Sequence, residues 1–587
     1  FHAEGKIVLN TNKLSTSGGI AWSKDDSEST IGNIKINLPN ENNPTTLYYS
    51  VVDGEYDPTL GTRLNDLIRN VGSEKKVLFK DLNLSDSSAA HGGAIHNFSD
   101  GGYSIHADFI SNYTKSENST ARGGAVYNSE NVLISNITGD FIGNNASSRE
   151  GYAQGGAVYN SEKGTIGTIT GNFIDNYTTA SKDFAKGGAI YNYYGTIGAI
   201  TGNFIDNHAS SGGAIYNDKG TIGNITGDFI GNYVSSSSSS PLQGGAVFNS
   251  EWISNITGDF IGNHVSSSSS ALGGAVYNLS TIGNITGDFI GNNASSSSSS
   301  ALGGAVYNLN TIGNITGNFI GNHVSSSAVA QGGAIYNFGT ITITGDSTFT
   351  DNYVEPNGGV GTSNAIHNLK TVNFDGTNIV VNDAITGNNG TINIASSSNG
   401  MTTFNNSVSG NTVNLIKGTL KLGHYKSEKF GDSYGLFENS VNFVAQGGKL
   451  TTQDGETNTH NLGNLKLSAD LNTSIDVDLN TKTGDVLTGS TAAAAAEGKK
   501  ILIDNINVLA DGTNHIVKVQ VADENIKDVM DLANDAKVKL DDTDFRKYLI
   551  IYEKNATSGN LKFGQVDALE TAVQFPNANK AFAMGSD

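Results

Sequence analysis

The sequence predicts an all-β protein, a right-handed parallel β-helix with three short strands per turn and capped ends. Two motifs carry this prediction. Gly-Gly-Ala occurs nine times, and Phe-x-x-Asn follows each copy at a nearly fixed distance. From the first Gly to the last Asn a unit has 20–22 residues, and 4 to 11 residues separate successive units. A constant framework that varies in length at one point is typical of a solenoid with loops at one corner. The Gly-Gly-Ala motifs begin at Gly92, Gly123, Gly155, Gly187, Gly212, Gly244, Gly273, Gly303 and Gly332.

Each unit divides into three apolar pieces, which in residues 212–232 read GGAIYN, TIGNIT and GDFIGN. Each piece has the length of a strand and is rich in Ile, Val, Thr, Tyr and Phe. The same piece of the next unit can pair with it in parallel about 4.8 Å away, so identical residues form columns. Asn at the turns suits this stacking, because its amide can bond the amides of the turns above and below. A propeller blade needs about 40 residues, whereas Gly187 and Gly212 are only 25 positions apart. The right-handed winding follows from the general preference of parallel crossovers.

The motif pattern also divides the chain into segments. The expected segments are an N-terminal cap with first turns (1–88), nine regular turns (89–352), degenerate turns (353–445), a C-terminal cap (446–563) and a linker (564–587).

Several irregular stretches carry their own local predictions. IVLN and TIGNIKINL resemble early turns of the β-helix, and LYYSVV a further strand. Apolar spacing predicts a short helix capped by Thr62, a helix within 521–540 and an amphipathic helix in 564–587. The alanine run 492–496 is expected to be a linker or loop, and residues 548–564 a closing hairpin.

The composition excludes several classes of protein. A net charge of −21 disfavours nucleic acid and anionic membrane surfaces as partners. There are no cysteines, so disulfides and thiolate metal sites are excluded, and we expect no cofactor. The chain starts at Phe1 and has no apolar run long enough to span a bilayer, which suggests a mature protein whose signal peptide has been removed.

The paired motifs resemble the polymorphic membrane protein group of autotransporters. The resemblance rests on GGA[IV] with FxxN, as in Gly155–Val158 and Phe173–Asn176. Residues 418–437 and 447–479 are also similar to the segment that caps the β-helix ahead of the translocator barrel in autotransporter passengers. The resemblance implies an adhesin at the surface of a Gram-negative-type bacterium or shed from it. Its implied partners are a receptor or glycan on host or neighbouring cells, further copies of the chain, and a translocator barrel. Nothing after Phe563 is long enough to be that barrel, so either this is a cleaved passenger or the secretion route differs.

Two columns of apolar side chains are the candidate binding surface. If the Phe of each unit points inward, strand alternation directs the next residue, an Ile, outward. If Ile215 points inward, Tyr216 points outward in the same way. A contiguous exposed apolar strip usually marks a contact surface, here for self-association or for stacking on a glycan. The alternative is that Gly231 bends the strand and buries both Phe229 and Ile230. The Ile column is Ile142, Ile174, Ile205, Ile230, Ile261, Ile290 and Ile320. The Tyr column is Tyr127, Tyr159, Tyr191, Tyr216, Phe248, Tyr277, Tyr307 and Tyr336.

The alternative function is a β-helix carbohydrate-active enzyme, either a polysaccharide lyase or a hydrolase. Asp140, Asp228, Asp259 and Asp288 form one outward column, but Asn interrupts it, and sugar hydrolysis needs two differently placed carboxylates. Ser433 lies in a G-x-S-x-G sequence that lacks the strand–turn–helix context of a nucleophile elbow. We therefore predict that the protein is not an enzyme.

Two further sets of polar residues are expected to have no chemical role. His208, His264 and His323 share a position but never occupy neighbouring turns, which argues against a metal site. Serine runs follow Asn232, Asn263 and Asn292, and we expect them to be poorly ordered, either as plain flexible loops or carrying O-linked sugars.

Overall fold

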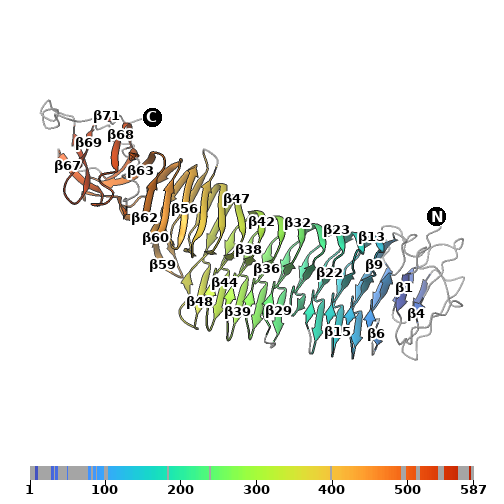
Figure 1. The fold of residues 1–587 in the computed structure, drawn as a ribbon. Coiled ribbons are helices and arrows are strands. Elements are labelled where there is room, and N and C mark those ends of the chain that lie inside the picture. The colour runs from blue at the N-terminus through green and yellow to red at the C-terminus, as the bar shows by residue number, and fades with distance from the viewer. Residues whose placement is uncertain are drawn as a thin grey trace. The chain divides into compact units, whose positions relative to one another are not determined.

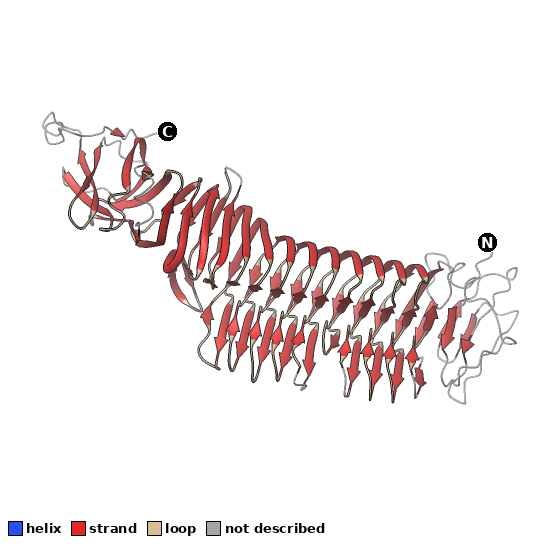
Figure 2. Cartoon of the chain, in the orientation of Figure 1, coloured by secondary structure: helices blue, strands red, loops and turns tan. Residues whose placement is uncertain are grey.

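The structure is a computed structural model, and it is all-β over the residues it describes (Figures 1 and 2). No helix among them has the length and apolar character needed to cross a bilayer. The chain forms two compact units, the first made of 1–315, 321–336 and 354–361 and the second of 316–320, 337–353 and 362–587. The structure describes backbone and side chains for residues 89–97, 104–181, 184–236, 240–396, 399–490, 498–510, 516–539 and 548–564. Outside these ranges it describes only the backbone of short strands.

In the first unit, equivalent strands of successive turns are neighbours in one parallel sheet, as predicted. Strand β12 (Val126–Asn128) pairs with β17 (Val158–Asn160), and β17 pairs with β22 (Ile190–Tyr193), each residue opposite its counterpart. The Phe side chains are fully buried and stack with ring centroids 4.7–4.8 Å apart. This separation matches the distance between paired strands. The protein is therefore a parallel β-solenoid whose interior packs like on like.

Most regular turns contain five short strands, the three predicted ones and two more. One turn consists of β30 (Leu242–Gln243), β31 (Val247–Asn249), β32 (Trp252–Thr257), β33 (Phe260–Ile261) and β34 (His264–Ser267). The middle three are the predicted strands of the body. The first and the last belong to separate parallel sheets and form a lateral arm (Figure 2).

The arms have a hydrophobic core of their own, so the expectation of poorly ordered serine loops is wrong for the described serines. Ser235 and Ser236 of β29 (Tyr233–Ser236) pair with Ser266 and Ser267 of β34. In β34, Val265 and Ser267 are buried and Ser266 is exposed, so the strand alternates. The sequence does not reveal this alternation because serine occupies both inward and outward positions. The arm core consists of Val234, Leu242, Val265, Ala271, Ala294, Ala301, Val324, Ala330 and Val354.

The Gly-Gly pair forms the neck between body and arm. The first glycine has a left-handed backbone, as at Gly273 with φ of 67°. The second is enclosed by backbone: a Cβ on Gly274 would be 1.9 Å from the carbonyl oxygen of Gly304 in the next turn and 2.6 Å from the carbonyl of Asn293, the first residue of the arm strand β39 (Asn293–Ser296). Only glycine fits there because the two chain segments are in contact through their backbones.

Replacing Gly274 by alanine should lower the free energy of unfolding by more than about 3 kcal/mol, because backbone must move to make room. The control is Gly291→Ala, where φ is 62° and a Cβ would meet nothing within 4 Å. That change should cost only the left-handed backbone strain, about 1–2 kcal/mol. Urea unfolding of both variants measures the difference. Equal losses of unfolding free energy would contradict the close backbone contact at Gly274.

Two buried ladders of asparagine side chains fix the corners of the turns. At one corner Asn128 Nδ2 donates to Asn160 Oδ1 at 2.8 Å, and at the other Asn232 Nδ2 donates to Asn263 Oδ1 at 3.0 Å. All four residues are fully buried. The predicted bonding of Asn amides between turns is confirmed.

The second unit continues the parallel stacking with longer strands. Its strand β47 (Thr340–Thr350) pairs with β51 (Thr371–Val381), and further along the chain β60 (Leu436–Ala445) pairs with β62 (Thr459–Leu467). Four strands that pair in parallel one after another then build the last turns, namely β61 (Lys449–Thr451), β63 (Leu471–Asp478), β66 (Ile501–Ala510) and β68 (Met530–Lys539).

Two of the local predictions are wrong and one is confirmed. Residues 521–540 hold no helix: β67 (Ile516–Ala522) and β68 are strands, and Ile526 and Val529 are buried in the turn between them. TIGNIKINL is an antiparallel hairpin of β2 (Glu28–Ile31) and β3 (Ile34–Asn37), not a turn of the solenoid. The closing hairpin exists as β69 (Tyr548–Lys554) and β70 (Gly559–Gln565).

Three local predictions cannot be compared with the structure. The Thr62 helix and the 492–496 linker lie outside the described residues. So does the helix expected in 564–587, apart from the start of that range and the strand β71 (Ala581–Phe582).

Candidate binding surfaces

The Ile column points outward and is half-exposed, as strand alternation predicts. In each two-residue strand such as β28 (Phe229–Ile230), the Phe is buried and the Ile is partly accessible. Ile320, in the second unit, is 37% exposed. Gly231 has a left-handed backbone with φ of 63°, but the bend follows the strand and leaves Ile230 accessible. The alternative in which both residues are buried is therefore wrong. In the first unit the half-exposed members are Ile142, Ile174, Ile205, Ile230, Ile261 and Ile290.

Most of the Tyr column is buried, which contradicts the expectation of an exposed strip. Tyr159 and Tyr191 are each 1% exposed, and Tyr127, Tyr216, Phe248 and Tyr277 are buried as well. These side chains do point out of the body, but residues of the arm strand such as Leu272, together with partly buried Leu279 and Leu302, pack against them. The exposed Tyr strip was predicted without the arm strands, and it is these strands that bury the rings. Tyr307 and Tyr336 are half-buried.

The Tyr column is thus a structural spine where body and arm meet. Its rings stack with centroids 4.0–5.3 Å apart. Burial raises the pKa of Tyr277 to about 12, and burial together with the nearby Asp218 carboxylate raises the pKa of Tyr191. The Tyr191 hydroxyl donates to Asp218 Oδ2 at 2.7 Å. Stacked rings present only their edges to solvent, so a sugar ring has no face to stack on.

A second row of rings lies in the arm, at the position shared by His208 and His264, where the sequence predicted no chemical role. Tyr177, His208, Tyr233 and His264 are half-buried and stack at 4.9, 4.7 and 5.2 Å across four neighbouring strands of one arm sheet. Burial lowers the pKa values of His208 and His264. No group of three or more potential metal ligands occurs among the described residues. The alternation of Tyr and His at this position, three residues after the Ile column, was the available signal.

The Asp column has a structural role. The Asp228 carboxylate accepts the backbone N–H of Asp259 at 2.9 Å, and the Asp259 carboxylate accepts that of Asp288 at 2.8 Å. At the interruptions an Asn oxygen does the same, as Asn203 Oδ1 does for the N–H of Asp228. Asp and Asn are interchangeable here because the position requires only an acceptor.

Ser433 does not lie on a nucleophile elbow. It belongs to β59 (Gly431–Tyr434), which forms an antiparallel hairpin with β58 (His424–Ser427). Its hydroxyl donates to the Tyr425 carbonyl at 3.2 Å. The chain continues from this hairpin into another strand, so the motif has no catalytic geometry.

A polar hollow of about 610 Å³ lies on the outer face of the sheet formed by β61, β63, β66 and β68. Ile503 pairs with Leu532 and Asn505 with Lys537, so residues 533–536 bulge opposite Asp504 and form a wall. Lys449 Nζ lies 3.6 Å from Asp504 Oδ2, and Lys500 Nζ forms an ion pair with Asp531. This hollow could not be predicted from the sequence, because the apolar spacing of residues 521–540 indicates a helix where the structure has the strand that forms the wall.

The sequence matches no protein-family profile and no curated protein. Among solved structures, the chain is similar to the crystal structure of the Haemophilus influenzae Hap adhesin. The identity is 12% over 94% of this chain and 72% of that chain, with a TM-score of 0.19. A similarity of that size assigns neither a family nor a function to this chain.

Proposed function

We propose that this protein is a surface-displayed or secreted bacterial adhesin that acts by side-by-side association of β-solenoids through the Ile column. The observation that carries the proposal is the row of six half-exposed Ile side chains on consecutive turns of the first unit. Their strands pair in register, so the row has the spacing of the strands themselves. An identical row on a second copy has the same spacing, and burying both removes apolar surface from water.

The arrangement of the rings favours self-association over glycan stacking. The Tyr column is covered by the arms, and the second row presents ring edges. A receptor on a host or neighbouring cell is the alternative partner of the same Ile surface. Display at the cell surface, with a translocator barrel as the secretion partner, follows from the resemblance to autotransporters and is part of the same proposal.

Substituting Ile230, Ile261 and Ile290 together by Thr should abolish self-association while leaving the fold intact, because β-branched residues suit an exposed strand. The control changes Thr226, Thr257 and Thr286 to Ala, which are exposed on the same turns but on another strand. Sedimentation velocity measures association of the purified chain, and aggregation of cells displaying it measures adhesion. A folded Ile variant that associates and aggregates cells like the unmodified chain would contradict the proposal.

The carbohydrate-active enzyme is the second candidate, because the polar hollow gathers Asp and Lys side chains on one sheet face. Two of its lysines are already paired with carboxylates, which opposes their use as free bases. We expect no turnover when the chain is incubated with a panel of acidic and neutral polysaccharides. Turnover that disappears in Asp531→Asn would establish the enzyme instead.

A further inference from the structure

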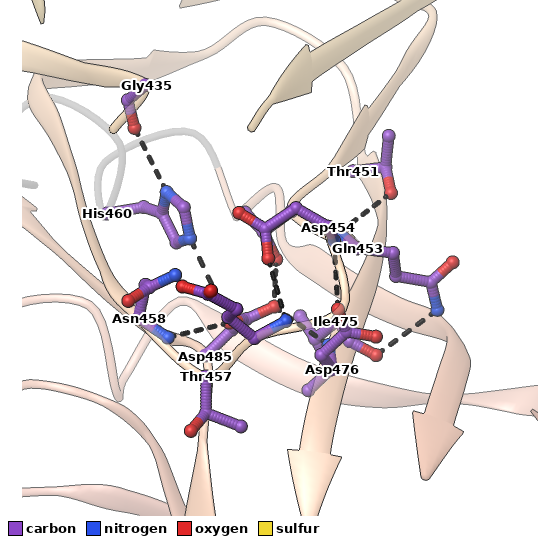
Figure 3. A network of polar contacts seen from close by, with 12 residues as sticks. Gly435, Thr451, Gln453, Asp454, Thr457, Asn458, His460, Ile475, Asp476 and Asp485 are labelled. Atoms are coloured by element: carbon purple, nitrogen blue, oxygen red, sulfur yellow. Dashed lines mark hydrogen bonds and ion pairs between the residues drawn. The ribbon is translucent and has the colours of Figure 1, made fainter. Parts of the chain in front are cut away.

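A buried network of carboxylates around one histidine lies in the second unit (Figure 3). Asp476, Asp485 and His460 are all fully buried. The Asp485 carboxylate accepts hydrogen bonds from Thr452 Oγ1 at 2.6 Å and from the backbone N–H of Asn458 at 3.0 Å. The Asp476 carboxylate accepts those of Asp454 and Gly455, at 2.9 and 2.8 Å. These two side chains hold the turn of residues 452–458, which joins β61 to β62.

The carbonyl of Gly435 fixes the tautomer of His460. It lies 3.0 Å from Nδ1, and because a carbonyl only accepts, Nδ1 must carry a proton. The other nitrogen, Nε2, makes no hydrogen bond and lies 3.8 Å from Asp485 Oδ1. In neutral His460 the Nε2 lone pair therefore faces a carboxylate. A second proton turns that contact into an attraction between opposite charges.

The charges around this pair are nearly all negative. Asp454 Oδ2 is buried without a hydrogen-bond partner, and Asp476 lies on the adjoining strand. At the rim His424 lies 3.7 Å from Glu456 and 3.7 Å from Asp432. Among the described residues, no Lys or Arg forms an ion pair with Asp454, Asp476 or Asp485. His460 is thus the one cationic group that can balance these carboxylates at close range in the described part of the unit.

We propose that His460 and Asp485 form a buried proton-binding site that fastens the turn of residues 452–458 when the proton is bound and loosens it when the proton leaves. The turn joins β61 to β62, so its opening frees the ends of these two strands. The turn of residues 452–458 therefore opens under alkaline conditions and is held closed in mild acid.

The direction of the pH dependence follows from the surroundings of each group. Burial by itself would lower the pKa of His460, but the Asp485 carboxylate and the Gly435 carbonyl outweigh burial and raise it above its ordinary value of 6.5. Burial raises the pKa values of Asp454 and Asp476 as well, with further contributions from neighbouring carboxylates. The folded turn therefore binds protons more tightly than the unfolded one. Its stabilisation by His460 is complete below about pH 6.5 and is lost as the pH rises through the pKa of the folded state.

Hydrogen–deuterium exchange of the full chain, at about pH 6 and about pH 8, tests this site. After correction for the intrinsic exchange rates, the opening equilibrium of residues 452–460 should rise with pH by up to about tenfold per unit, the limit for one proton. His460→Gln should remove that dependence. The matched control is His367→Gln in the same unit, because burial lowers the pKa of His367 to about 4 and keeps it neutral throughout.

Asp485→Asn gives an independent measurement if His460→Gln fails to fold. It removes the carboxylate charge while keeping an acceptor oxygen, so the pH dependence of the turn should disappear. Equal protection of the unmodified turn at both pH values would overturn the proposal, and so would a dependence that persists in either variant.

Discussion

Replacing Asn263 by alanine is expected to lower the free energy of unfolding by about 3 kcal/mol or more. Asn263 is fully buried, and its Nδ2 donates to the Phe229 carbonyl at 2.8 Å and to Asn292 Oδ1 at 3.0 Å. Its Oδ1 accepts the backbone N–H of Asn232 at 3.0 Å. Alanine leaves these buried groups without partners, and each costs about 1–3 kcal/mol.

Two other variants separate the ladder from a general effect of substitution. Asn263→Asp keeps the size but removes the donor, so it should destabilise nearly as much. Asn224→Ala removes an exposed Asn that accepts from Asn255 Nδ2 at 2.8 Å and should cost less than about 1 kcal/mol. Urea unfolding followed by circular dichroism measures all three. A small loss in Asn263→Ala would mean that water replaces the missing amide.

The second large effect is expected at Tyr191, in the spine between body and arm. Tyr191→Ala removes a ring that is 1% exposed and stacked on Tyr159 and Tyr216 at 5.2 Å each. Loss of an aromatic ring from a packed core costs about 3–5 kcal/mol. Tyr191→Phe loses only the hydrogen bond to Asp218 and should cost about 1 kcal/mol.

Tyr194→Ala is the control, since Tyr194 is close in sequence but 41% exposed. It should change the unfolding free energy by less than about 1 kcal/mol. If Tyr191→Ala and Tyr194→Ala were equally mild in urea unfolding, the Tyr column would be a surface and not a spine.

The body of the solenoid could be predicted from the sequence because its residues repeat at equivalent positions. The residues equivalent to Phe229 and Asn232 are Phe and Asn in every regular unit, and the position of Ile215 is always Ile or Val. Alternation within short strands gives the orientation of each. The outward direction of Ile230 followed from the same alternation and is confirmed.

The arm could not be predicted because few apolar residues mark its strands. Only Val234 and Leu242 mark its core in one turn, and the serines between them are typical of loops. Because the arm was not predicted, the Tyr column was expected to be exposed to solvent. The hollow beside Asp504 was missed for a different reason, since apolar residues of a bulged strand and its turn fell by chance at helical spacing.

The most direct test of adhesion through the Ile column is a single cysteine within it, because the chain has none of its own. Ile261→Cys under mild oxidation should give a disulfide-linked dimer, since identical columns that pack together bring the two sulfurs within bonding distance. Thr257→Cys, on the same turn but outside the column, should stay monomeric. A dimer from Thr257→Cys, or none from Ile261→Cys at concentrations where the unmodified chain associates, would contradict the account.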